Sequence, residues 1–186
     1  MLKTGTAQRG FNMIEVLISM TILGILVSLA GPSFFQFMAN SQIRSAADAM
    51  QNGLQTARGA AIARNLPVRI TVGPLTSWSV VEQTSGAVIQ SREGAEGTPN
   101  VGLATLPSGA ISITFSPLGA VTQNADGTAA ITQMDFSNPS GGNCETGSPA
   151  GAIRCLRMLV TGGGSIRMCD PKLTAMGLTA DPRACP

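Results

Sequence analysis

The stretch that decides the fold of this chain is Gly10-Phe11-Asn12-Met13-Ile14-Glu15, which precedes an almost wholly apolar run from Val16 to Ala30. The run is close to the roughly 20 residues that a helix needs to cross a bilayer. A carboxylate inside such a segment is costly unless a partner neutralises it. Glu15 therefore requires a cationic partner, and this requirement predicts assembly with another molecule.

The same stretch resembles the N-terminal signature of type IV pilins and of the related type II secretion pseudopilins. In that class a prepilin peptidase removes a short basic leader that ends in Gly, and the same enzyme methylates the new N-terminal residue. The resemblance implies a leader of residues 1–10, cleavage between Gly10 and Phe11, and N-methylation of Phe11. The methylated amine of a neighbouring subunit would then neutralise Glu15 during filament assembly.

Two alternatives explain part of this segment. An ordinary secretory signal peptide would be cleaved after Ser28-Leu29-Ala30 and would leave a soluble periplasmic protein that begins at Gly31. A plain single-span anchor would account for the apolar run. Neither alternative accounts for Glu15. An ordinary signal peptide rarely carries an acidic residue in its apolar region, and a plain anchor explains the apolar run but gives the carboxylate no role. We therefore adopt the pilin-like interpretation.

The first third of the chain is predicted to form one long helix. After Pro32, six apolar residues recur at spacings of four and three, which places them on one stripe of a helix. We expect this stripe to pack against the protein's own sheet. Pro32 is predicted to kink the helix where it leaves the membrane, and Pro67 is predicted to end it. The stripe consists of Ile43, Ala47, Met50, Leu54, Ala57 and Ala61.

Beyond Pro67 the apolar residues alternate with polar ones, as in strands with one buried face. The alternation is clearest at 68–72 and 111–115, and clusters such as Gly73-Pro74 and Ser140-Gly141-Gly142 indicate turns between the runs. The predicted fold class is α+β: a long, partly transmembrane N-terminal helix packed on an antiparallel β domain, with either two packed sheets or one curled sheet. Other short strands are predicted at 78–81, 87–90, 121–123, 130–136 and 153–160.

A length of 186 residues is sufficient for one domain and an anchor. The predicted organisation has a cleaved leader, a transmembrane half of the helix that also forms the filament core, an amphipathic half of the helix, and a β-rich globular domain with a disulfide-closed tail. These four parts span residues 1–10, 11–31, 32–66 and 67–186.

The composition argues against catalysis. The formal charge of +2 belongs to the leader, because removal of Lys3 and Arg9 leaves ten basic and ten acidic residues. The chain has no His, the commonest general base and metal ligand. It also has no Gly-x-Ser-x-Gly elbow, and Gly162-Gly163-Gly164 is predicted to form a tight turn before the last strand, not an anion-binding loop. We therefore expect no enzymatic activity and no cofactor.

Four cysteines follow residue 143, which agrees with an exported domain. Three pairings are possible, and we favour Cys144 with Cys155 and Cys169 with Cys185 because each pair joins nearest neighbours in the sequence. Closing the loop from Cys169 to Cys185 would contribute about 3 kcal/mol of stability. A zinc site is the alternative, but the chain has no CxxC pair and no His, so we expect no bound metal.

Two later regions narrow the resemblance. The segment 115–121 and the ending, 166–171 with 181–186, look like the minor-pilin branch called FimT, which is grouped with the pseudopilin GspH. Before assembly, this resemblance implies a single-pass inner-membrane protein whose globular domain faces the periplasm. After assembly, it implies a subunit of a type IV pilus that contacts other major and minor pilins and can lie at the pilus tip. The alternative is a GspH-like pseudopilin of a type II secretion system.

A binding function is predicted in the C-terminal region, where five basic residues and two acidic ones lie between Gly151 and Pro186. The resemblance implies DNA binding in natural transformation, since some FimT-type pilins use a Gly-Arg-x-Arg motif here. The matching stretch, Gly164-Ser165-Ile166-Arg167, retains only the second Arg. Weak, salt-dependent contact with double-stranded DNA and pairing with Asp170, Asp181 or the C-terminal carboxylate both stay open. The basic residues are Arg154, Arg157, Arg167, Lys172 and Arg183.

Overall fold

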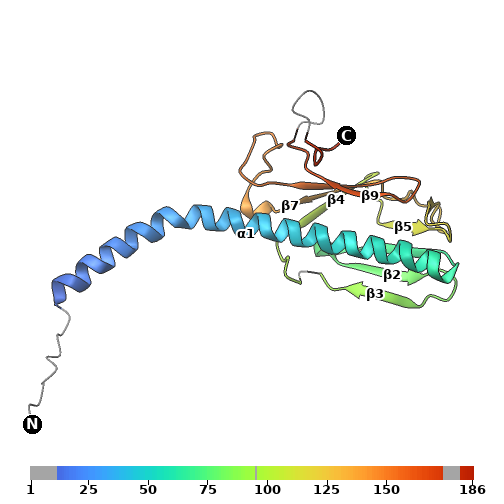
Figure 1. Cartoon of the computed structure of the whole chain (residues 1–186), viewed down its shortest axis with the longest axis horizontal. Helices are drawn as coiled ribbons and strands as arrows, with labels where there is room; N and C mark the ends of the chain where they lie inside the picture. Colours follow the sequence, from blue (N-terminus) through green and yellow to red (C-terminus); the bar gives the residue numbers. More distant parts are fainter. Residues whose placement is uncertain (1–11, 95, 174–180) are drawn as a thin grey trace, which may run out of the picture. The chain divides into compact units, whose positions relative to one another are not determined.

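The structure, a computed structural model, describes residues 12–94, 96–173 and 181–186. It divides into two compact units, Met1–Phe35 and Gln36–Pro186, and each is described by itself. Helix α1, Met13–Arg64, contributes residues to both units (Figure 1).

In the first unit, the described residues form the N-terminal part of α1. The helix begins directly after Asn12, whose carbonyl accepts the backbone N–H groups of Glu15 and Val16 at 3.0 and 3.3 Å. Glu15 lies in the first turn, where the helix dipole favours a carboxylate. Large apolar side chains follow one another along this part of the helix, and they are exposed at Met13, Ile14, Val16, Leu17, Ile18, Met20, Ile22, Leu23, Ile25, Leu26, Val27 and Leu29.

The apolar part of α1 meets the requirements of a membrane crossing only in combination with the helical segment that follows it. Among the described residues, no single straight helix is long and apolar enough, whereas the bent pair Met13–Leu29 and Ser33–Arg64 meets the criteria of length and composition together. Pro32 lies between these two segments, but its side chain is not among those described. The proline kink therefore remains a prediction.

In the second unit, the stripe predicted from the sequence is the buried face of α1. All six of its residues have an exposed fraction of 0%, and they form one apolar cluster with residues of the strands. The prediction that the helix packs on the protein's own β-structure is thus confirmed. The helix ends at Arg64, earlier than predicted from Pro67, because Asn65 adopts the left-handed conformation, with φ of 53°, that commonly terminates helices.

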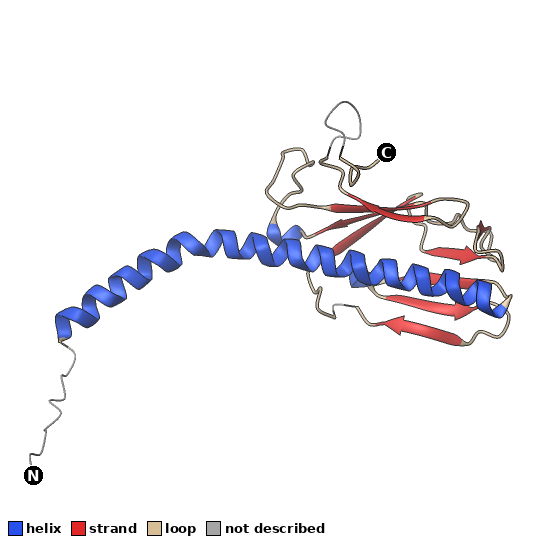
Figure 2. Cartoon of the chain, in the orientation of Figure 1, coloured by secondary structure: helices blue, strands red, loops and turns tan. Residues whose placement is uncertain are grey.

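Two antiparallel sheets complete the second unit (Figure 2), which settles the choice between one curled sheet and two. The first sheet has the order β3-β2-β1-β5-β6 and the second the order β4-β7-β8-β9. The strands of the first sheet are β1 (Val68–Val72), β2 (Trp78–Glu82), β3 (Val88–Arg92), β5 (Ser112–Phe115) and β6 (Val121–Thr122). Those of the second sheet are β4 (Gly102–Leu106), β7 (Gln133–Ser137), β8 (Leu156–Val160) and β9 (Ile166–Cys169).

The alternating pattern in the sequence gives each central strand one buried face. In β1, for example, Val68, Ile70 and Val72 are buried and the two residues between them are half-buried. The indole ring of Trp78, on the neighbouring β2, comes close to α1 at Gly53: a Cβ atom at that position would lie 2.9 Å from the ring. The missing side chain of Gly53 therefore allows this close contact between the helix and the first sheet.

The second unit contains its own core. Every residue of the buried apolar cluster lies between Ala39 and Val160, and both disulfides lie within the same unit. These are the interactions expected of a domain that folds independently. The unit can therefore be studied without the apolar N-terminal segment.

Candidate functional site

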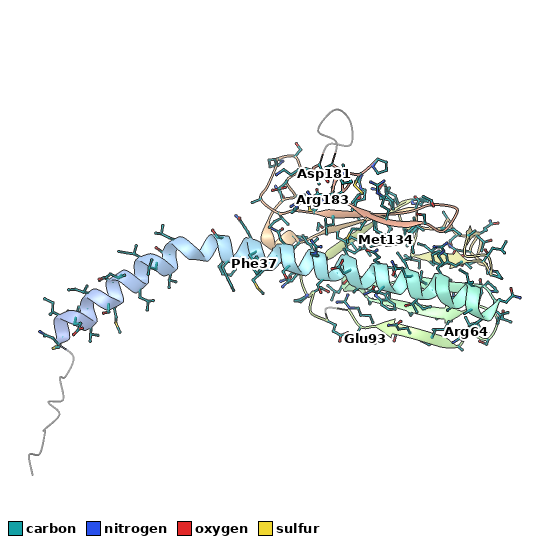
Figure 3. All side chains as sticks on the ribbon, viewed as in Figure 1. Phe37, Arg64, Glu93, Met134, Asp181 and Arg183 are labelled. Atoms are coloured by element: carbon teal, nitrogen blue, oxygen red, sulfur yellow. A yellow bond between two sulfur atoms is a disulfide. The ribbon has the colours of Figure 1, made fainter. Side chains whose placement is uncertain are left out.

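The five basic residues of the predicted binding region lie on β8, on β9 and in the segments next to them. Arg157 is on β8 and Arg167 is on β9, and these two strands pair antiparallel. Arg154 precedes β8, whereas Lys172 and Arg183 follow β9. Figure 3 labels Arg183 and its neighbour Asp181 near the C-terminus. The fold thus brings the described basic residues between Arg154 and Arg183 to one region of the second unit.

Arg157 is paired with a carboxylate from another strand. Asp135 of β7 lies directly opposite Arg157 in the antiparallel register. Arg157 Nε and Nη2 donate to Asp135 Oδ1 and Oδ2 at 2.6 and 3.2 Å. A two-pronged pair of this kind fixes the plane of the guanidinium group. Arg157 is therefore held against the sheet surface.

Arg154 and Lys172 are connected through Asp170, which is almost fully buried with an exposed fraction of 4%. Its Oδ2 accepts a hydrogen bond from Arg154 Nε at 2.5 Å, and its Oδ1 accepts one from the backbone N–H of Lys172 at 2.9 Å. The ammonium group of Lys172 lies 2.8 Å from Glu145 Oε2. A buried carboxylate must be satisfied in this way, so Asp170 also fixes Arg154.

Arg183 forms a local pair with Asp181. Its Nε and Nη2 donate to the two carboxylate oxygens at 3.0 and 2.8 Å, and its backbone N–H donates to Oδ1 at 2.8 Å. These hydrogen bonds from Arg183, the side-chain ones first, lower the pKa of Asp181 to about 2. They also raise the pKa of Arg183 above its ordinary value.

Arg167 binds the C-terminal tail. Its Nη2 donates to the carbonyl oxygens of Pro182 and Ala184 at 3.0 and 3.1 Å. Of the five basic residues, it alone has no carboxylate within ion-pair distance in the described part of the chain. Its side chain is exposed on β9, so it combines a role in holding the tail with access to solvent.

The sequence therefore anticipated only part of this network. Pairing with Asp170 and Asp181 was one of the two open interpretations, but Asp135 and Glu145 were missed. With these two included, five basic residues face four acidic ones. Asp135 could have been found only from the register of β7 with β8, which a local charge count does not contain.

The turn between β8 and β9 gives Gly164 a packing role. As predicted, 161–165 is a tight turn, closed by a hydrogen bond of 2.8 Å from the Gly164 N–H to the Thr161 carbonyl. Gly164 has φ of 77°, and a Cβ atom there would lie 1.9 Å from the carbonyl oxygen of Gly119. Arg58 Nε, from α1, donates to the same oxygen at 3.1 Å. Gly164 therefore lies where its own turn, the turn at Gly119 and α1 come together, whereas Ser165 is exposed.

The four cysteines form two disulfides, Cys144–Cys155 and Cys169–Cys185, with Cα atoms 5.5 and 5.0 Å apart. These are the two pairs favoured from the sequence. All four thiols are used in this way, so none is available for the alternative zinc site. The second disulfide and the Arg167 hydrogen bonds hold the same tail.

At the N-terminus, Gly10 and Phe11 lie outside the described residues, so the predicted cleavage site stays a prediction. Glu15 is described and exposed, and it takes part in none of the ion pairs found among the described residues. In one isolated copy of the protein it thus keeps the need for a cation that the sequence predicts.

A long helix with an exposed apolar N-terminal part, packed further along on antiparallel sheets, defines a pilin-like protein. Residues 46–171 match the family described as "Type II transport protein GspH", and residues 5–31 match the "Prokaryotic N-terminal methylation motif". The first match covers more than half of the chain, and the chain belongs to the GspH family, the pilin-like GspH/FimT group.

A solved structure agrees with this fold. The type IV minor pilin FimU of Pseudomonas aeruginosa, in space group P21, is similar with a TM-score of 0.51 and 16% sequence identity, over 69% of this chain and 88% of FimU. A second crystal form of FimU, in space group P65, gives a TM-score of 0.48 and 17% identity over 67% and 90% of the two chains. At this identity the likeness of the first form establishes the fold alone.

Membership of the family fixes the broad function. The proteins of this family are structural pilins and pseudopilins, which assemble with other pilins and are processed by a prepilin peptidase through the N-terminal methylation motif. The apolar N-terminal helix and the motif together indicate membrane anchoring and association with a pilus.

Proposed function

We propose that this chain is a FimT-like minor pilin, a structural subunit of a type IV pilus. Residues 11–31 hold it in the inner membrane after removal of residues 1–10, and the β-rich unit faces the periplasm until assembly. The observation that supports assembly into a filament is Glu15, exposed among apolar side chains within the N-terminal methylation motif, and the disulfide-closed tail, which resembles FimT, favours the minor pilin over the pseudopilin. Such a carboxylate favours insertion beside a cationic neighbour.

The proposed neighbour is the methylated amine of Phe11 in an adjacent subunit. A Glu15→Ala variant should still be cleaved between Gly10 and Phe11, but its amount in sheared filaments should fall at least about tenfold, because removing a charge partner inside an apolar core costs more than 1.4 kcal/mol. Gly10→Val should block cleavage itself. Immunoblots of whole cells and sheared pili measure both effects.

Ser19→Ala is the matched control for Glu15→Ala. Ser19 lies one turn further along α1, and the one acceptor of its hydroxyl among the described residues is the Glu15 carbonyl, at 2.7 Å. It should therefore assemble as the unchanged protein does. Normal incorporation of Glu15→Ala would contradict the role proposed for the carboxylate.

The alternative within the family is a GspH-like pseudopilin of a type II secretion system. Deletion of the gene distinguishes the two functions. Loss of pili with normal release of secreted enzymes supports the minor pilin, whereas blocked release with intact pili supports the pseudopilin. Complementation with Glu15→Ala should restore neither phenotype in either case.

DNA binding is a second candidate, favoured by the exposed position of Arg167 on β9. Because the other four basic residues each have a carboxylate neighbour, few phosphate contacts are available, so binding should be weak and should disappear at physiological salt. Several subunits in one filament, for example at its tip, would strengthen the binding of DNA through avidity.

A mobility-shift assay of residues 36–186 with double-stranded DNA tests this candidate. Arg167→Glu combined with Lys172→Glu should abolish the low-salt shift and reduce transformation of the cells. Arg92→Glu, a charge reversal on β3 in the other sheet, should leave both unchanged. An unchanged shift in the double variant would remove these residues from the DNA interface.

A further inference from the structure

The second unit contains a cavity whose lining includes neither Glu15 nor Arg167. It has a volume of about 500 Å³ and lies between α1 and the region of β8, β9 and the tail. Pockets for small molecules typically measure about 300 to 1,000 Å³. The cavity is therefore large enough for a small ligand.

Apolar side chains line the cavity from three elements. Phe37 contributes from α1, Leu156 from β8 and Met168 from β9. Figure 3 labels Phe37 on the helix. Cys169, the first cysteine of the tail disulfide, is also part of the wall. This lining suits an apolar body of a ligand.

Three arginines, Arg44, Arg154 and Arg183, line the same cavity together with Asp170, whose carboxylate is already paired with Arg154. Arg154 is fixed by the buried Asp170 through Nε alone among the described hydrogen bonds, which leaves its terminal amino groups to donate elsewhere. The backbone N–H of Arg154 also donates to Asn40 Oδ1 at 2.9 Å, which holds the arginine next to the helix. Arg154 is thus a positioned donor at the cavity.

Arg44 is the least constrained of the three. Its side chain is 76% exposed, and its Nε lies 4.0 Å from Asp48, at the limit of an ion pair. A surface pair of this kind contributes little, so Arg44 can turn toward a ligand at small cost. A carboxylate or a similar anion is the group that guanidinium donors bind best.

We propose that this cavity binds a small ligand with an apolar body and one anionic head group, of the medium-chain carboxylate class. The apolar wall would hold the body, and Arg44 with the fixed Arg154 would hold the head group. This proposal does not depend on which filament the subunit joins.

The test uses residues 36–186 labelled for NMR and three probes with the same eight-carbon tail: octanoate, octanol and octyltrimethylammonium. Octanoate should shift the amide signals of Asn40, Ser41 and Met168 saturably and bind about tenfold more tightly than the cationic probe, since one charge-assisted hydrogen bond corresponds to about that factor. Equal affinity for the three probes, or no saturable shift at these residues, would overturn the proposal.

Two variants and one control locate the site. Arg44→Glu should weaken octanoate binding about tenfold and leave octanol binding unchanged. Ser41→Phe places a ring in the cavity from an exposed helix position and should abolish binding of both probes. Arg92→Glu makes the same charge change on β3 and should alter neither affinity. Persistence of binding in Ser41→Phe, or an equal loss in Arg92→Glu, would show that the ligand binds elsewhere.

Discussion

At the scale of single residues, each charged side chain in the C-terminal region has a described partner. The buried Asp170 accepts a hydrogen bond from Arg154, and Asp135 of β7 accepts one from Arg157 of the neighbouring β8. Arg167 differs, because it binds carbonyl oxygens of the tail. A count of basic residues in this region therefore overestimates the positive charge that DNA would meet.

Asp181 gives a prediction on pH. Its pKa is lowered to about 2 in the folded protein by the hydrogen bonds from Arg183, whereas its ordinary value is 3.8. The stabilisation that it provides is therefore complete above the ordinary value and is lost as the pH falls through about 2. Asp181→Asn should remove this stabilisation at neutral pH and flatten the stability profile between these pH values.

Urea unfolding of residues 36–186 at a series of pH values measures this effect. Asp48→Asn is the control, because it removes a different exposed carboxylate, which lies 4.0 Å from Arg44 at the limit of an ion pair. The Asp181 hypothesis fails when the Asp181→Asn profile keeps the same slope as that of the unchanged protein.

At the scale of elements, the helix and the first sheet are fitted together at Gly53 and Trp78. Gly53→Ala places a methyl group 2.9 Å from the indole ring, and overpacking of this kind should lower the free energy of unfolding by roughly 1 to 2 kcal/mol. Gly59→Ala is the matched control on the same helix, since a Cβ atom there meets nothing within 4 Å. It should raise stability by about 0.5 to 1 kcal/mol.

Denaturant unfolding of both variants measures the difference, with the near-ultraviolet signal of Trp78 as a second probe. A stabilising Gly53→Ala would show that the indole ring can move away without cost. A destabilising Gly59→Ala would contradict the open space around this position.

The elements themselves were predictable where their periodicity was strong. The stripe from Ile43 to Ala61 and the alternation at 68–72 correspond to the buried faces of α1 and β1. Strand β4 was missed, because Gly102 and Ala104 have low strand propensity and an edge strand needs only one neighbour. The end of α1 was placed too late, since Pro67 obscured the terminating role of Asn65.

At the scale of the whole molecule, the family could be inferred from the N-terminal signature and the tail, and the match to GspH supports that inference. The cavity was not predictable. Its lining residues, such as Phe37, Arg154 and Met168, are far apart in the sequence, and only the packing of α1 beside β8 and β9 brings them together. The carboxylates that pair with the arginines were hidden for the same reason.

The disulfides provide a prediction on the second unit as a whole. Cys169→Ser with Cys185→Ser should lower its free energy of unfolding by about 3 kcal/mol, since the bond closes a loop with a sequence separation of 16. The far-ultraviolet circular dichroism should not change, because neither cysteine belongs to the central apolar cluster. Loss of the sheet signal in this variant would show that the apolar cluster depends on the disulfide that fixes the tail.

Both disulfides join cysteines that are close in the sequence, and both lie near the C-terminal end of the chain. The helix and most strands can therefore reach their native contacts before any thiol is oxidised. We therefore expect oxidation of Cys169 and Cys185 to fix the tail on an interior that does not need this bond to form. A subunit with reduced cysteines should accordingly have a formed interior, whereas the tail and the cavity wall at Cys169 would lack their covalent link.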